Sequence, residues 1–80
     1  MPPLKQFKRL DVRPLLQQGR EPLSTIRAGV ARLKPGQGLL VIAPFLPAPL
    51  IELLRGEGFL SKVEHGRQGA WRVYFWRDTD

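Results

Sequence analysis

The chain of 80 residues contains no cysteine and only one histidine, His65. Without thiols it cannot form a disulfide, a thiolate metal site or a cysteine nucleophile, and one histidine cannot by itself build a structural zinc site. We therefore expect no metal and no cofactor. His65 falls beside a glycine-rich turn, where an exposed side chain is expected rather than a general base. The thin inventory of reactive groups predicts that the protein is not an enzyme.

Long hydrophobic runs are also missing. The longest apolar stretch, residues 39–51, is interrupted by three prolines and is far shorter than the roughly 20 residues of a membrane helix. The segment 1–5 carries no apolar core and no small-residue cleavage site of the kind that marks secretion. We therefore expect no membrane partner and a cytoplasmic location.

Acidic residues are in the minority, with 7 Asp and Glu against 13 Lys and Arg and a formal net charge of +6. This balance favours anionic partners through long-range attraction. The basic residues are spread along the chain, whereas nucleic-acid-binding arms usually carry dense basic runs. The charge is therefore compatible with nucleic-acid binding, but a role in solubility alone is the simpler explanation.

Hydrophobic periodicity predicts six elements in the order β-α-β-α-β-β. Two helices are expected to begin at Pro22 and Pro49 and to end at glycine-containing turns. The continuous apolar run from Leu39 to Ala43 is typical of a strand that is buried on both faces, and so of a central strand. The predicted strands are 7–12, 38–43, 59–65 and 70–77.

These elements predict an α/β (α+β) two-layer sandwich, in which a mixed four-stranded sheet carries both helices on one face. A single domain is expected over residues 7–77, between a loose N-terminal tail at 1–6 and a C-terminal tail at 78–80. The other face of the sheet then has no helical cover, and we call it the open face.

The open face is a candidate partner surface because the last strand alternates aromatic and basic side chains. Self-association or a protein partner would use such a surface, and single-stranded nucleic acid stacks on aromatic platforms of this kind. The alternative is that long arginine stems simply cover the rings. The candidate partner residues are Arg9, Arg72, Tyr74 and Trp76, together with Phe45 from the loop after the second strand.

Several motifs carry a family resemblance. Leu10-Asp11-Val12-Arg13, Gly19-Arg20-Glu21-Pro22 and Pro35-Gly36-Gln37-Gly38 resemble the TusA-like or SirA-like small domains, which are sulfur carriers. The segment Ala43–Leu50, followed by Gly58-Phe59 and Trp71-Arg72-Val73, more closely resembles their cysteine-free relatives, the domain of unknown function 2249. The resemblance covers residues 10–77 and implies a TusA-like fold.

In the TusA-like pattern a Cys-Pro-x-Pro motif begins the first helix, and its cysteine carries a persulfide. Matching that motif places Gly19 on the cysteine and leaves only Pro22 in common, so sulfur relay is excluded by composition. A helix N-terminus can still receive a small anion, with Arg20 supplying charge. The alternative is that Glu21 itself complements the helix dipole. The ligand-binding candidates are Arg13, Gly19, Arg20, Glu21 and Pro22.

We therefore expect a non-enzymatic binding or accessory domain that acts through protein contacts. The resemblance implies a redox or nitrogen-oxide respiration context. One alternative is an RNA or single-stranded nucleic-acid binding module that uses the basic, aromatic open face. Another is a degenerate sulfurtransferase homologue that docks to the partners of its relatives without carrying sulfur.

Overall fold

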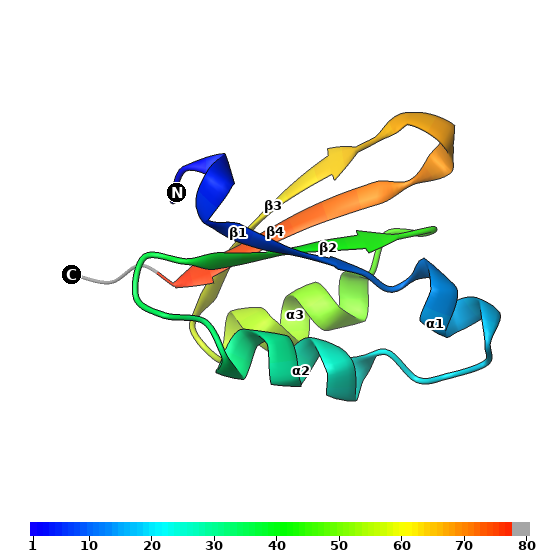
Figure 1. The fold of residues 1–80 in the computed structure, drawn as a ribbon, viewed down its shortest axis with the longest axis horizontal. Helices are drawn as coiled ribbons and strands as arrows, with labels where there is room; N and C mark the ends of the chain where they lie inside the picture. Colours follow the sequence, from blue (N-terminus) through cyan, green and yellow to red (C-terminus); the bar gives the residue numbers. More distant parts are fainter. Residues whose placement is uncertain (78–80) are drawn as a thin grey trace.

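The computed structural model describes residues 1–77, apart from the side chain of Gln68, so the predicted tail at 78–80 lies outside it. Its sheet has the order β1-β2-β4-β3, in which β1 and β2 are parallel and the other neighbours antiparallel. Helices α2 and α3 lie side by side on one face of this sheet (Figure 1). The predicted two-layer sandwich is confirmed. The strands are β1 (Phe7–Asp11), β2 (Gly38–Ala43), β3 (Phe59–His65) and β4 (Trp71–Arg77), and the two helices are α2 (Leu23–Ala31) and α3 (Ala48–Gly56).

One helix was not expected from the sequence. The strand predicted for residues 7–12 ends at Asp11, and a short helix, α1 (Arg13–Gln17), follows it (Figure 1). Pro14 occupies its first turn, where a missing N–H costs no hydrogen bond. The remaining short elements are 3₁₀ turns: η1 (Leu4–Gln6), within the segment predicted as a loose tail, and η2 (Arg67–Gly69) in the β3–β4 connection.

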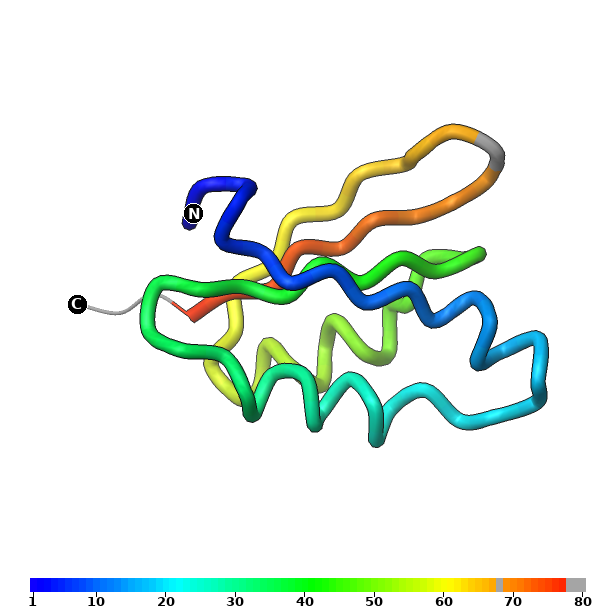
Figure 2. Tube along the Cα trace, in the orientation of Figure 1, coloured from blue at the N-terminus to red at the C-terminus, as the bar shows by residue number. Residues whose placement is uncertain are grey.

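The core lies between the sheet and the two helices. Leu39 and Val41 of β2 face the same layer as their register partners Phe75 and Val73 of β4, and all four are buried. The helices contribute one fully packed side chain each, Ile26 in α2 and Leu54 in α3. The β3–β4 hairpin extends beyond the ends of both helices (Figure 2). Its far end therefore has no helix to pack against, and the core is confined to the part of the sheet that the helices cover.

Candidate functional site

An apolar groove opens where α2 and α3 begin, next to α1 and to the carboxyl end of β2. Its volume is about 260 Å³, and its walls are almost entirely carbon. The carboxyl ends of parallel strands are where α/β folds place their binding sites. The groove is lined by Val12, Leu16, Glu21, Pro22, Leu23, Ile26, Val41, Ala43, Phe45, Pro47, Pro49, Leu50 and Leu53.

The rim of this groove leaves large apolar side chains in water. Phe45 is 52% exposed and Leu53 is 36% exposed, and the neighbouring Leu46 is 43% exposed. Exposed apolar side chains that border a concave apolar surface are typical of a binding site. Phe45 is a candidate partner residue from the sequence, and it lies at the groove together with Glu21 and Pro22.

Of residues 1–77, Glu21 is the only charged residue that lines the groove. Its carboxylate accepts hydrogen bonds from the backbone N–H groups of Leu23 and Ser24, at the start of α2. The carboxylate therefore satisfies the donors that a bound anion would use, and it complements the positive end of the helix dipole. Arg20 beside it is exposed and does not line the groove. An anion site at this helix N-terminus is thus occupied by the chain itself.

Gly19, one of the ligand candidates from the sequence, has a local structural role. Its φ of 72° lies in the left-handed region, and it follows the last turn of α1. The N–H of Gly19 donates to the Leu16 carbonyl at 3.1 Å, and the N–H of Arg20 donates to the Leu15 carbonyl at 2.9 Å. This pair of bonds is the Schellman pattern that terminates helices at glycine. Gly19 is therefore explained by the end of α1.

Arg13, another ligand candidate, is engaged by Asp11. Its Nε donates to Asp11 Oδ1 at 2.9 Å and its Nη2 donates to Oδ2 at 2.7 Å, while its backbone N–H donates to Oδ1 at 3.0 Å. The side-chain hydrogen bonds from Arg13 are the main cause that holds the pKa of Asp11 below its usual range. The Nε and Nη2 groups of Arg13 are thus engaged by Asp11 in a bidentate pair. Arg13 does not line the groove.

The open face holds an aromatic cluster that is more buried than expected. Gly38 is the register partner of both Phe7 and Trp76, so these residues lie on one face of the sheet. Because side chains alternate along β4, Tyr74 and Arg72 lie on this same face, away from the helices. Tyr74 was expected to be exposed, but it is only 6% exposed. The Phe7 ring contacts it edge-to-face with centroids 5.1 Å apart. Tyr74 is buried because β1 brings the Phe7 ring beside β4, and the alternation of side chains along one strand does not reveal such a neighbour.

The Tyr74 hydroxyl donates to Glu64 Oε1 at 3.1 Å. Burial, followed by this hydrogen bond to a carboxylate, raises the pKa of Tyr74 above its usual value. Of the other partner-face candidates, Arg9 and Arg72 are exposed and Trp76 is half-buried beside Phe7. The open face therefore has a charged surface over a largely covered aromatic cluster.

Sequence reasoning missed most of the groove. Leu50, Leu53 and Leu54 share one face of α3 by their helical spacing, yet of the three only Leu54 is fully buried, whereas Leu50 and Leu53 line the groove. A helical apolar stripe has the same sequence whether its neighbour fills the space beside it or leaves it open. The proline-rich segment 44–49 was the available signal, because it forms the loop after β2 and the start of α3, and Pro47 and Pro49 line the groove.

The remaining candidates for chemistry are spread out. His65 is exposed and stacks on Trp71, with ring centroids 4.2 Å apart, far along the hairpin. Among residues 1–77, no cluster of three or more histidine and acidic side chains has the arrangement needed to hold a metal ion. In the same part of the chain, no helix has the length and apolar character that crossing a membrane requires.

Comparison with known proteins gives one match. The family model described as "Uncharacterized conserved protein (DUF2249)" matches residues 9–77. This range includes α1, α2, α3 and all four strands, apart from the first two residues of β1. Searches of curated proteins and of solved structures gave no match. Because the matched segment spans most of the chain, and because it contains the motifs around Pro44, Phe59 and Trp71 that indicate this family, the chain belongs to the DUF2249 family of uncharacterized conserved proteins.

Proposed function

We propose that this protein is a non-enzymatic binding domain, and that its groove receives an apolar segment of a partner protein. The observation that carries this proposal is the combination of an almost wholly apolar groove with exposed Phe45 at its rim. Aromatic side chains at a pocket edge are the usual anchors of protein interfaces. The charged side chain that lines the groove, Glu21, accepts hydrogen bonds from backbone N–H groups.

The chemistry of the groove supports binding rather than catalysis. General acid–base work needs titratable groups with altered pKa values, and covalent catalysis needs an activated nucleophile. The groove walls supply proline, leucine, isoleucine and valine side chains. The resemblance to TusA-like carriers supports a docking role in a cytoplasmic redox or nitrogen-oxide respiration pathway, because the groove includes Pro22 of the matched motif.

The alternative is nucleic-acid binding on the open face. Exposed Arg9 and Arg72 and half-buried Trp76 favour it, together with the net charge of +6. Burial of Tyr74 weakens it, because a base can stack only on an exposed ring. Self-association through the same face meets the same difficulty, since the apolar area that it offers is largely covered by Phe7. The groove is therefore the better-supported surface.

The test is site-specific photo-crosslinking in the native cells. A benzophenone amino acid replaces Phe45 in one variant and Leu60 in a matched control. Leu60 is 45% exposed, similar to Phe45, but it lies on the open face beside Trp76. We expect a discrete protein adduct from position 45 that is absent from position 60. Adding Leu53→Asp should remove this adduct, because a carboxylate in the groove wall opposes apolar contact.

Adducts that form equally at positions 45 and 60 would contradict the proposal, as would an adduct at 45 that survives Leu53→Asp. Ribonuclease-sensitive adducts at position 60 alone would instead support the nucleic-acid alternative. Circular dichroism of each variant confirms that the fold is retained, which is expected because both replaced side chains are exposed.

A further inference from the structure

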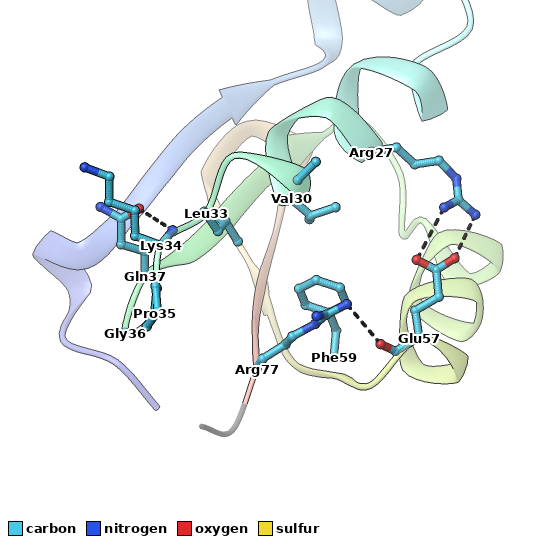
Figure 3. Close-up of a pocket in the computed structure, with 11 residues that line it drawn as sticks. Arg27, Val30, Leu33, Lys34, Pro35, Gly36, Gln37, Glu57, Phe59 and Arg77 are labelled. Carbon is cyan, nitrogen blue, oxygen red and sulfur yellow. Dashed lines mark hydrogen bonds and ion pairs between the residues drawn. The ribbon is translucent and has the colours of Figure 1, made fainter. Parts of the chain in front are cut away.

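A second cavity lies at the other end of the helical layer, away from the groove, and is independent of the proposed function. Its volume is about 440 Å³. The residues that surround it come from the end of α2, the turn before β2, the end of α3, the start of β3 and the end of β4 (Figure 3). Segments distant in the sequence thus meet here, and the volume falls within the range of small-molecule sites.

One wall of this cavity is apolar. Val30 and Leu33 approach from the α2 side, and the Phe59 ring faces them from the start of β3 (Figure 3). Phe59 is only 6% exposed, so the ring is fixed in the core while one part of it borders the cavity. Such a surface offers contact to an apolar body about the size of a ring.

Arg77 supplies a positioned positive charge. Its guanidinium carbon lies 4.5 Å from the centre of the Phe59 ring, and its Nη2 donates to the Glu57 carbonyl oxygen at 3.3 Å. Stacking and this hydrogen bond together restrict the side chain beside the cavity. No carboxylate of residues 1–77 lies within ion-pair distance of Arg77. Within residues 1–77 its guanidinium donates only to the Glu57 carbonyl, so with respect to this part of the chain its other N–H groups can donate to an anion.

The other charges at the cavity largely cancel. Arg27 holds the Glu57 carboxylate with two hydrogen bonds, of 2.7 and 3.3 Å. Among residues 1–77, Glu57 is the only carboxylate that lines the cavity, so this pair reduces the repulsion that an anion would meet from these residues. Lys34 lines the opposite side, but its side chain points away from the opening (Figure 3). Within the described part of the chain, two guanidinium groups against one carboxylate give the cavity lining a positive charge.

We propose that this cavity binds a small organic oxyanion, whose carboxylate or phosphate meets Arg77 and whose apolar body lies against Val30, Leu33 and Phe59. Arg77 is the recognition residue, because a guanidinium fork matches both kinds of oxyanion. Arg27 acts indirectly, by neutralising Glu57. The binding requires both halves of the ligand, since the cavity offers one charged wall and one apolar wall.

The test is a titration followed by amide chemical shifts, with benzoate, phenyl phosphate, inorganic phosphate and benzyl alcohol as probes. We expect benzoate or phenyl phosphate to change the amide chemical shifts of Gln37, Glu57 and Gly58. Whichever of the two probes binds more tightly identifies the preferred anionic group, carboxylate or phosphate. Inorganic phosphate and benzyl alcohol should each bind at least tenfold more weakly. Equal binding of inorganic phosphate would overturn the proposal, because it would show that the apolar wall contributes nothing.

Charge variants separate recognition from structure. Arg77→Gln should weaken binding at least tenfold, whereas the matched change Arg55→Gln, at an exposed residue outside the cavity, should leave it unchanged. Arg27→Gln and Glu57→Gln break the same ion pair, yet the first should weaken binding and the second should strengthen it. Equal effects of these two variants would mean that the pair acts only structurally, and would overturn the proposal.

Discussion

The ring of Phe7 in β1 lies over Gly38 in β2, where the neighbouring strand has no side chain. A Cβ atom built on Gly38 would lie 2.7 Å from the Phe75 carbonyl oxygen and within a similar distance of Cδ2 of Phe7. Both distances are far below ordinary van der Waals contact. The missing side chain lets the Phe7 ring cross to β4, where it meets Tyr74 and Trp76 edge-to-face.

Gly38→Ala is therefore expected to lower the free energy of unfolding by about 1–3 kcal/mol, the range of overpacked positions. Urea denaturation measures this loss. Gly56→Ala is the matched control, because a Cβ there has no neighbour within 4 Å and Gly56 is helical. That control should be neutral or stabilising by up to about 1 kcal/mol. A neutral Gly38→Ala would contradict the packing of Phe7 over β2.

Gly19→Ala should destabilise the fold by about 1 kcal/mol, because alanine at a φ of 72° is strained. Gly19→Asn should cost less, since asparagine tolerates this conformation. Both values follow from urea denaturation. Photo-crosslinking from position 45 should be unaffected by Gly19→Asn. Its loss in a folded variant would show that Gly19 contributes directly to the groove, beyond ending α1.

Two adjacent leucines of α3 should respond very differently to truncation. Leu54→Ala should cost about 2–5 kcal/mol of unfolding free energy, because Leu54 is 0% exposed in the core. Leu53→Ala should cost less than about 1 kcal/mol, because its side chain lines the open groove. Thermal unfolding and urea denaturation of both variants measure the contrast. Similar losses would mean that the groove is closed in solution.

Asp11 makes stability depend on pH in the acid range. Because its folded pKa is lowered, chiefly by the Arg13 hydrogen bonds, its contribution is present above the pKa of the unfolded chain and is lost as pH falls through the folded value. The difference in unfolding free energy between the natural chain and Asp11→Asn should therefore shrink below about pH 4.

Urea denaturation at several pH values checks this expectation. Glu52→Gln is the control, because Glu52 forms only an exposed pair with Arg55 at 3.5 Å and such pairs add little. A difference between the natural chain and Asp11→Asn that stays constant down to about pH 2 would show that the Asp11–Arg13 pair does not form in solution.

Tyr74 is the only tyrosine, so the absorbance of its phenolate can be followed without interference from another. Its folded pKa is raised, first by burial and then by the Glu64 hydrogen bond, so it should titrate above the ordinary value of about 10. The neutral form then contributes stability that is present below the unfolded pKa and lost as pH rises.

Glu64→Gln should move this titration back toward the ordinary value, because it removes the negative charge beside the hydroxyl. Glu57→Gln, at a carboxylate on the other face of the sheet, is the control and should leave the titration in place. An unshifted titration in the natural chain would show that Tyr74 is exposed, and would restore the open face as a stacking surface.

The family assignment and the architecture were both accessible from the sequence. The run Leu39–Ala43 identified the central strand, since only a strand covered on both faces is apolar throughout. Prolines and glycines placed the two main helices within a few residues of their bounds. The helix α1 was missed, because its five residues are too few to show a helical period.

Local patterns therefore determined the element order, the alternation of side chains along each strand, and the absence of thiol chemistry. Only the tertiary structure decided which of those side chains remain in water. Tyr74 is buried because β1 brings Phe7 to it, Leu53 lines a groove because nothing fills the space between two helix ends, and Arg77 faces a cavity that five segments enclose. Exposure depends on neighbours that are distant in the chain, and the period of a strand or helix carries no information about them.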